Sequence, residues 1–448
     1  MTTMSHRELD NLQTSLNNAL NSLRVAMDES MLSPLSSQYG IDMHPLDGLD
    51  QPTPVGVYKA RQAALACVAE LKNLLQHPFE KAAESTFAMY DFATVQVFVE
   101  HGIVDRMAKE PSGISVKTLQ SELDLDAHKL TTVLRHLSAC GWIRETQDGI
   151  FAMNRSSRIL LQGQRGRALI SVPGNMKIAE ALPRWLTHPE FRFSESPEHT
   201  AFQLANDTTK PFFEWAKDDR NYLGRFAACV EAIGEYVTPG ILSDYPWQTC
   251  LKSTIVDCGG GKGSLAIALA NKRGRRWSRL AEANIKAHLD PNSVPGTVVA
   301  EARDLFSAQP RTGDNYTFML RHVLHNWPDA QAVSVLEKLA AAAGPESKIL
   351  IIERISGHYP DTHVQLEHDP TNTTDITTSA SLITEQTLLN SSSRMPHALA
   401  LHLLCILNCH ERTLDQWRTI ISRAGLVVTG LYKLRAYVSV MECRVIHT

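Results

Sequence analysis

The sequence contains no apolar run close to the roughly 18 residues that a membrane-spanning helix needs. It also has no basic excess, since 44 Lys and Arg stand against 48 Asp and Glu and the net charge is −4. This balance argues against nucleic acid or an anionic membrane as a partner, because both attract basic surfaces. The N-terminus, MTTMSHRELDNLQ, lacks a basic stretch followed by an apolar core, so no secretory signal is expected. We therefore expect a cytoplasmic protein.

The eight cysteines include no paired CxxC motif. They lie in apolar segments, which favours buried free thiols in a reducing compartment. Cys405, Cys409 and His410 are close together in the sequence and could suggest a metal site. No second ligand pair completes a zinc site, so the sequence predicts no bound metal.

A length of 448 residues predicts two or three domains. The sequence pattern suggests four segments, which are an N-terminal helical extension over 1–78, a winged-helix-like dimerisation domain over 79–165, a helical segment over 166–240 and an α/β domain over 241–448. The segment over 166–240 is rich in aromatic residues, most of which are expected in the core. Its place just before the α/β domain also suits the lid of an apolar substrate pocket.

Hydrophobic spacing in the N-terminal half predicts helices over 5–30 and about 57–75. Residues 80–160 then read as helix, turn, helix and hairpin, a winged-helix pattern. The second of these helices has an apolar stripe at i, i+3, i+4 and i+7, formed by Leu130, Val133, Leu134 and Leu137. The hairpin turn is expected at Gln147-Asp148-Gly149.

A DNA-binding winged helix would present several basic side chains on its second helix. This helix offers Lys129 and Arg135, beside Asp124 and Asp126. A scaffold or dimerisation role is therefore favoured over DNA binding.

From about residue 251 the pattern alternates between strands and helices, which predicts a parallel, doubly wound α/β sheet. Strands are expected at 254–258, 298–302, 316–320 and 348–352, with helices at 265–270 and 333–343. The segments 426–430 and 436–440 are expected to form a closing antiparallel pair. The Thr- and Ser-rich stretch 361–395 interrupts the alternation and is predicted to be a surface insertion.

A glycine-rich loop, VDCGGGKG over 256–263, lies where a predicted strand ends and a helix begins. Glycines there let the backbone turn tightly and approach a ligand, and the helix N-terminus adds free N–H groups. The loop is neither a Walker loop nor GxGxxG, because its spacing is GGGxG. It predicts a nucleotide-like ligand in the crevice of the sheet, with a purely structural turn as the alternative.

A second motif, LRHVLHNWPD over 320–329, follows another predicted strand and lies at the same edge of the sheet. A histidine there can act as a general base, because its ordinary pKa of about 6.5 leaves much of it neutral at pH 7. His322 and His325 could instead be metal ligands, but no third ligand joins them in sequence. The other alternative is a polar residue of a surface loop.

The motifs VDCGGGKG, EARDLF, LRHVLHNWPD, ILIIERI and CHERTLDQW occur in this order. Together they resemble the caffeic-acid-type O-methyltransferases of plants and fungi, particularly the fungal secondary-metabolism branch. The resemblance covers about 60–448 and includes the winged-helix unit and the segment AFQLANDTTKPFFEW. It implies a class I methyltransferase fold and a homodimer with interlocked N-terminal domains. The implied reaction transfers the methyl group of S-adenosylmethionine to a phenolic or enolic oxygen of a small molecule.

The resemblance also implies roles for individual residues. Gly259, Gly260, Gly261 and Gly263 would form the cofactor loop, Asp304 and Leu305 would hold the adenine, and Arg321 would contact the cofactor. His325 would be the catalytic base, and Glu353 and Glu411 would flank and orient it. A carboxylate beside the histidine favours the tautomer that can accept the proton of the substrate hydroxyl.

Two positions depart from the family pattern. Asn326 follows the expected base where the family usually has Asp. The stretch 271–282 is strongly basic where the family has an apolar strand that ends in an acidic residue for the ribose hydroxyls, so Glu282 is the nearest carboxylate for that role.

The second departure leaves another class of function open. Some fungal proteins of this fold act as pericyclases or dehydratases on polyketide-derived intermediates and transfer no methyl group, often with the histidine replaced by a basic residue. His325, Glu353 and Glu411 favour methyl transfer, whereas the basic stretch favours the alternative. A non-catalytic regulator that uses the winged helix would need a basic face, which the sequence does not show.

Overall fold

The computed structural model describes residues 6–38, 43–250, 253–273, 301–357, 364–365 and 394–446. The chain divides into two compact units. The first contains the described residues of Met1–Lys177 and Phe213–Ile233. The second contains those of Ile178–Phe212, Gly234–Ser381 and Arg394–Thr448. The four segments suggested by the sequence remain a prediction.

The first unit begins with the two predicted helices, α1 (Arg7–Glu29) and α2 (Val55–Leu75). They pack through small and apolar side chains, namely Leu23, Ala26, Met27, Val57 and Ala60. The remaining helices of this unit before its winged-helix core are η1 (Pro45–Asp47) and α3 (Pro78–Phe87).

The winged-helix pattern is confirmed in the first unit. Its elements are α4 (Met89–Glu100), α5 (Ile103–Met107), β1 (Ile114–Ser115), α6 (Val116–Leu123), α7 (Ala127–Ala139), β2 (Ile143–Gln147) and β3 (Ile150–Met153). The side chains of Ser115 and Asp126 cap α6 and α7 by accepting backbone N–H bonds. The predicted stripe on α7 faces the core, with Leu130, Leu134 and Leu137 buried. The strands form a small antiparallel sheet in the order β1-β3-β2.

The helices predicted over 166–240 are also present. They are α8 (Arg165–Ile170), α9 (Asn175–Thr187), α10 (Ala201–Asn206), α11 (Phe212–Asp218) and α12 (Arg220–Asp244), preceded by the short η2 (Ser156–Leu160). Trp185, Phe202 and Phe212 are buried, as expected for core aromatics, whereas Phe213 is half exposed.

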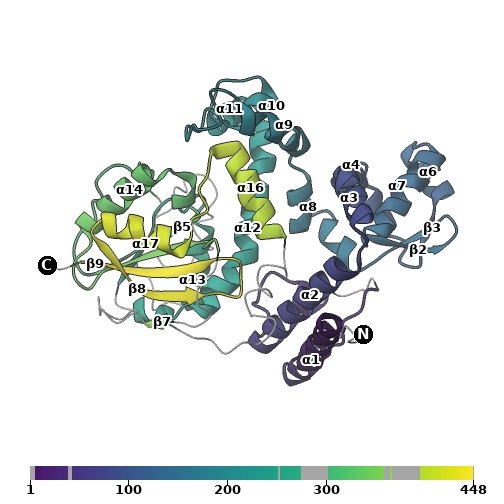
Figure 1. The fold of residues 1–448 in the computed structure, drawn as a ribbon, viewed down its shortest axis with the longest axis horizontal. Helices are drawn as coiled ribbons and strands as arrows, with labels where there is room; N and C mark the ends of the chain where they lie inside the picture. The colour runs from purple at the N-terminus through teal and green to yellow at the C-terminus, as the bar shows by residue number, and fades with distance from the viewer. Residues whose placement is uncertain are drawn as a thin grey trace, which may run out of the picture. The chain divides into compact units, whose positions relative to one another are not determined.

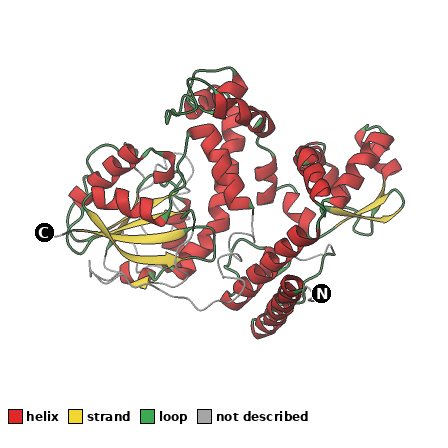
Figure 2. Ribbon diagram, viewed as in Figure 1, coloured by secondary structure: helices red, strands yellow, loops and turns green. Residues whose placement is uncertain are grey.

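The second unit contains a six-stranded mixed sheet in the order β4-β5-β6-β9-β8-β7. Figure 2 shows its strands in yellow. The three strands β4 (Thr254–Asp257), β5 (Tyr316–Arg321) and β6 (Lys348–Glu353) run parallel. The strands β9 (Ser439–Val445), β8 (Leu426–Lys433) and β7 (Val364–Gln365) continue the sheet antiparallel. The predicted parallel sheet and its closing antiparallel pair are therefore confirmed.

Helices cover both faces of this sheet (Figure 1). The helices α14 (Asp329–Ala342) and α17 (Leu414–Arg423) pack on one face, and α13 (Ser264–Arg273) and the end of α12 pack on the other. Alternation along β5 sends Phe318 and Leu320 to the first face and Met319 to the second. Ile349 to Ile352 of β6 are all fully buried, as a continuous apolar run predicts for a strand covered on both sides. The remaining elements are η3 (Trp247–Cys250), η5 (Leu324–Asn326) and α16 (Met395–Leu407).

Some predicted boundaries were wrong or cannot be compared. The last strand begins at Ser439 rather than 436, because Arg435 is held in a turn by the Asp244 carboxylate, which bonds both its backbone N–H and its guanidinium. Glu301 and Ala302 lie outside any strand, and the rest of the strand predicted at 298–302 lies outside the described residues, as does Glu282. Most of the insertion 361–395 also lies outside them.

All eight cysteines are free, and six of them are buried as expected. Cys140 is exposed and Cys229 is partly exposed, so the prediction of burial was wrong for these two. Cys140 is the residue that ends α7, where the chain turns at the surface of the first unit. Across the part of the chain that the structure describes, no helix combines the length and apolarity needed to cross a bilayer.

Candidate active site

Charged side chains terminate the three parallel strands of the second unit. Asp257 is the last residue of β4, Arg321 of β5 and Glu353 of β6. Because the carboxyl ends of parallel strands share one edge of the sheet, the loops that follow these residues form a common crevice. Both motifs singled out in the sequence lie in these loops.

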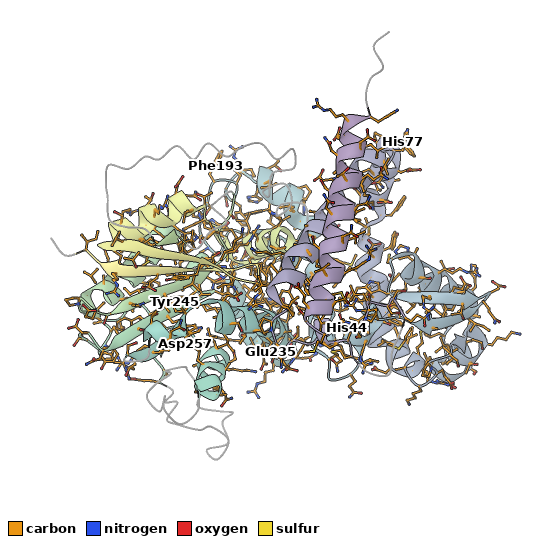
Figure 3. The ribbon with its side chains drawn as sticks, turned by 90° about the horizontal axis from the view of Figure 1, so that it is seen from below. His44, His77, Phe193, Glu235, Tyr245 and Asp257 are labelled. Carbon is orange, nitrogen blue, oxygen red and sulfur yellow. The ribbon has the colours of Figure 1, made fainter. Side chains whose placement is uncertain are left out.

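The glycine-rich loop connects β4 to α13. Gly259, Gly261 and Gly263 have φ of +75°, +59° and +74°, a left-handed conformation that residues with a side chain rarely adopt. A Cβ on Gly260 would overlap the carboxylate of Asp257, which is labelled in Figure 3. A Cβ on Gly261 would meet no described atom within 4 Å, so this glycine faces open space.

The loop that carries the predicted base contacts the glycine-rich loop. A Cβ on Gly259 would lie 2.9 Å from Cγ2 of Val323 and 3.6 Å from Cδ1 of Leu305. Leu305 therefore lies beside the glycine-rich loop, where the family resemblance implies an adenine contact. Asp304 is exposed, and its carboxylate accepts the N–H of Phe306 within its own turn.

Arg321 is fixed in this crevice by two hydroxyl groups. Its guanidinium donates to Oγ1 of Thr238 and to Oγ of Ser264, both at 3.2 Å. Burial lowers the pKa of Arg321 from its ordinary value, with the nearby Asp257 opposing the change. Thr238 lies on α12 and Ser264 at the start of α13, so Arg321 links both helices to the end of β5.

Asp257 is buried without a hydrogen-bond partner. Its side chain is 3% exposed, and neither carboxylate oxygen has a partner among the described residues. Burial raises the pKa of Asp257 from 3.8 to about 6, and the positive charge of Arg321 limits the rise. An orphaned buried carboxylate is costly for a fold, which is consistent with a site that accommodates a cationic ligand.

His325 lies in the short η5 turn after β5 and is 7% exposed. The peptide groups around it are held by Glu353, whose Oε1 accepts the N–H of Val323 and Leu324 at 2.9 Å and that of His325 at 3.4 Å. The other oxygen, Oε2, lies 3.5 Å from Nδ1 of His325. One carboxylate therefore both shapes the turn and faces the imidazole. Burial raises the pKa of Glu353, and the charge of His325 opposes this.

Glu411 approaches the same ring nitrogen, with Oε1 3.4 Å from Nδ1 of His325. Its Oε2 lies 3.9 Å from the guanidinium of Arg354. Burial alone would lower the pKa of His325, but the two carboxylates outweigh burial and raise the pKa above its ordinary value. With both carboxylates at Nδ1, that nitrogen carries the proton and Nε2 is left as the basic atom.

Arg412 supports the turn that carries His325 and was not identified from the sequence. It is 2% exposed and donates to the carbonyl oxygens of Leu324 at 3.1 Å and Trp327 at 2.7 Å. It also pairs with Asp329 at 2.8 Å. Its place next to Glu411 in CHERTLDQW was the available signal, but the carbonyl partners lie more than 80 residues away in sequence.

Asn326 has a structural role that Asp could not reproduce. Its Nδ2 donates to the carbonyl of His322 at 3.2 Å, and its Oδ1 accepts from Sγ of Cys409 at 3.3 Å. An aspartate carboxylate has no N–H for the first bond. The departure from the family pattern at this position is therefore matched to its surroundings.

A stack of rings leads away from His325. His322 stacks on His325 with ring centroids 5.7 Å apart and on Tyr437 with centroids 6.0 Å apart. Tyr437 in turn stacks on Tyr236. Nε2 of His322 and the hydroxyl of Tyr437 are buried without partners among the described residues. Burial lowers the pKa of His322 well below 6.5 and raises that of Tyr437, so both rings stay neutral near pH 7.

Most residues that the sequence suggested therefore come together. Within the second unit, Gly259, Leu305 and Val323 are in contact distance, and His325, Glu353 and Glu411 form one cluster. Asp304 points into its own turn, and Glu282 lies outside the described residues. The residues that only the structure identifies are Arg412, Thr238, Ser264 and Tyr437.

The fold is that of class I S-adenosylmethionine-dependent methyltransferases. A solved structure described as a pericyclic reaction enzyme is similar with a TM-score of 0.67 and 19% identity, over 86% of this chain and 94% of that one. The mitomycin 7-O-methyltransferase MmcR is similar with a TM-score of 0.61 and 18% identity, over 82% of this chain and 97% of that one. At these identities the likeness shows the fold alone.

Sequence comparisons find O-methyltransferases among the similar proteins. The family model of the O-methyltransferase domain matches residues 193–380. The 3-O-methyltransferase 2 of Phanerochaete chrysosporium is 28% identical over 88% of this chain and 90% of its own length. The O-methyltransferase gedA of Aspergillus terreus is 24% identical over 86% of each chain. The chain therefore contains an O-methyltransferase domain over 193–380, and most of its length is similar to fungal O-methyltransferases.

Proposed function

We propose that this enzyme transfers the methyl group of S-adenosylmethionine to a phenolic or enolic hydroxyl of a small secondary metabolite, with His325 as general base. The observation that carries the proposal is the pair of carboxylates at one nitrogen of a buried histidine, 3.4 Å and 3.5 Å from Nδ1. This arrangement leaves Nε2 available to accept a proton. His325 lies in a turn that contacts the glycine-rich loop.

The residues of the crevice fit the proposed cofactor. S-adenosylmethionine carries positive charge on its sulfonium and amino groups, and Asp257 is a buried carboxylate in need of a partner. The open face of Gly261 admits the close approach of a ligand to the backbone. Leu305 offers an apolar contact beside Gly259 that suits the adenine ring. When bound, the cofactor supplies an electrophilic methyl group.

The acceptor hydroxyl must lose its proton as it attacks that methyl group. A phenol with a pKa near 10 is a weak nucleophile at pH 7. Nε2 of His325 would take the proton of the hydroxyl as its oxygen displaces S-adenosylhomocysteine from the methyl group that the bound cofactor would supply. The carboxylates of Glu411 and Glu353 stabilise the imidazolium that results. Glu353 also fixes the peptide groups of the turn, so the ring is held in place before the reaction.

The test replaces His325 with Gln and measures methyl transfer to a panel of phenols by the mass of the product. General base catalysis contributes about 10²- to 10⁴-fold, so kcat should fall by that factor while the affinity for S-adenosylmethionine stays unchanged in calorimetry. His188→Gln changes a histidine whose ring caps a surface turn of the same unit and should retain full activity. Full activity in His325→Gln would show that His325 is not the general base.

A second candidate is a cyclase of the pericyclase or dehydratase type that acts on a polyketide-derived intermediate. The basic sequence of 271–282 supports it, because the family has an acidic ribose contact in that region. The two candidates differ in the mass of the product, which gains one methyl group only in the transferase reaction. A cyclase would convert its substrate with no change in S-adenosylmethionine.

We further propose that the enzyme acts in the cytoplasm as a homodimer, as the family resemblance implies for its N-terminal helices. Sedimentation equilibrium of the full chain tests the oligomeric state. A mass close to 49.7 kDa at micromolar concentration would show a monomer.

A further inference from the structure

A cluster of three metal-ligating side chains lies in the first unit, separate from the residues of the candidate active site. It contains Asp91 of α4, His136 of α7 and Cys140, the residue that follows α7. His136 and Cys140 are four residues apart, so they lie on the same face of α7, one turn from each other. Each side chain offers one atom of a kind that binds zinc.

The three ligand atoms form a nearly regular triangle. Nε2 of His136 lies 3.0 Å from Oδ1 of Asp91, Sγ of Cys140 lies 3.4 Å from that oxygen, and Sγ lies 3.6 Å from Nε2. Tetrahedral zinc with bonds of about 2.0 Å to N and O and about 2.3 Å to S requires separations of about 3.3 to 3.6 Å between its ligand atoms. The observed triangle therefore needs only a few tenths of an ångström of adjustment to hold the ion.

We propose that Asp91, His136 and Cys140 bind one zinc ion on the surface of the winged-helix unit. The side chains are accessible from solvent, with His136 36% and Asp91 58% exposed and Cys140 also exposed. Three protein ligands leave one tetrahedral position for water or a further donor. The contacts that these three side chains make with one another join α4 to α7.

The donor set selects the type of ion. A thiol and an imidazole together favour zinc and similar transition metals over Mg²⁺ and Ca²⁺, which prefer oxygen ligands. Zinc binds cysteine as the thiolate, so its binding displaces the thiol proton and becomes tighter as the pH rises.

Zinc at this position should also stabilise the folded unit. The helices α4 and α7 both contribute to its buried core, through Phe98 and Val99 from α4 and Leu134 and Leu137 from α7. An ion bound to both helices ties together elements that are otherwise joined by apolar packing. Because binding occurs in the folded state, bound zinc should raise the melting temperature of the protein.

The experiment uses the full chain, stripped of metal with a chelator, and titrates it with Co²⁺ as a spectroscopic probe and then with Zn²⁺ in a calorimeter. The expected result is one ion per chain, with the near-ultraviolet absorption that Co²⁺ shows only when a thiolate is a ligand. Zn²⁺ should displace Co²⁺ and abolish this band. Titrations without a thiolate band, or without stoichiometric binding at micromolar metal, overturn the proposal.

Variants separate this site from metal bound elsewhere on the chain. Cys140→Ser should lose the thiolate band, and Asp91→Asn should weaken Zn²⁺ binding by at least about tenfold, since one of three ligands is impaired. His128→Gln is the matched control, because His128 is exposed on the same helix and lies outside the triangle. Unchanged zinc affinity in both Cys140→Ser and Asp91→Asn overturns the assignment. Circular dichroism of each variant confirms that it is folded.

Discussion

Nδ1 of His325 lies 3.4 Å from Oε1 of Glu411, and this contact is one of several that join the turn after β5 to the segment that follows α16. Glu353 and Glu411 together outweigh burial and raise the pKa of His325 above its ordinary value, so a larger share of the histidine is protonated near pH 7. A general base must be neutral before it accepts a proton, so activity should rise with pH through the pKa of His325.

Glu411→Gln removes one of the two negative charges at Nδ1. The pKa of His325 should fall, and the acidic limb of the pH profile of kcat/KM should move to lower pH. The plateau at high pH should fall by about tenfold, because the imidazolium formed during transfer loses a stabilising partner. Glu346→Gln, at an exposed position of the same unit, is the control. A pH profile that coincides with the wild type would exclude Glu411 from this role.

Charge at His325 also contributes to stability. Because the folded pKa is raised, its contribution is fully present below the unfolded pKa of about 6.5 and is lost as the pH rises through the folded value. Glu353 has a raised pKa as well, so its ionisation opposes folding over its own range.

Arg412→Met tests the support of the catalytic turn. The substitution keeps most of the side-chain volume but removes the guanidinium that donates to the carbonyls of Leu324 and Trp327. It also removes the pair with Asp329, which is half exposed and therefore contributes less. We expect a loss of about 2–4 kcal/mol in the free energy of unfolding, measured by urea titration, together with a lower kcat.

The control for this change is Arg418→Met, six residues further along the chain. Arg418 pairs with Asp415 at 3.5 Å on an exposed face of α17. Exposed ion pairs of this kind contribute about 0–1 kcal/mol, so the control should unfold almost as the wild type does. Equal stability losses in the two variants would show that the buried contacts of Arg412 contribute no more to the free energy of unfolding than an exposed ion pair does.

The sequence could predict the parallel strands because their apolar runs have the length and composition of strands covered on both faces. It could also predict the cluster of His325, Glu353 and Glu411, but only through the family resemblance. The contacts of Arg412 with the turn and of Arg321 with Thr238 join residues more than 80 positions apart. No local pattern encodes such pairings, because they depend on how the helices pack on the sheet.

The sequence did not predict the local backbone conformation either. His322 adopts a φ of +53°, which is uncommon for a residue with a side chain and which places its ring in the stack with Tyr437. The motif identified His322 only as one of two histidines three residues apart. The start of the last strand at Ser439 likewise depends on the contact between Arg435 and Asp244.

Gly260→Ala tests the glycine-rich loop. A Cβ at this position would overlap the carboxylate of Asp257, so the loop or the aspartate must move. We expect a loss of about 1–3 kcal/mol in the free energy of unfolding and at least tenfold weaker binding of S-adenosylmethionine.

Gly224→Ala in α12 is the control, since a Cβ there meets no described atom within 4 Å. This control should bind the cofactor normally and gain about 0.5–1 kcal/mol as a helical glycine replaced by alanine. Normal cofactor affinity in Gly260→Ala would show that the loop tolerates the displacement.

Asp257→Asn tests whether the buried carboxylate is kept for a ligand at the expense of stability. Because burial raises its pKa from 3.8 to about 6, the folded protein holds this proton more tightly than the unfolded chain does. Wild-type stability should therefore decrease as the pH rises from about 4 to about 6, and the neutral amide should escape this loss. The variant should be more stable than the wild type by up to about 3 kcal/mol at pH 7 and by little at pH 4. Urea titrations of the cofactor-free protein at both pH values measure the difference, with the exposed Asp415→Asn as control.

If the carboxylate serves the cationic end of the cofactor, Asp257→Asn should also bind S-adenosylmethionine more weakly, so stability and affinity should change in opposite directions. A variant that loses both would instead mark Asp257 as a structural residue of the turn.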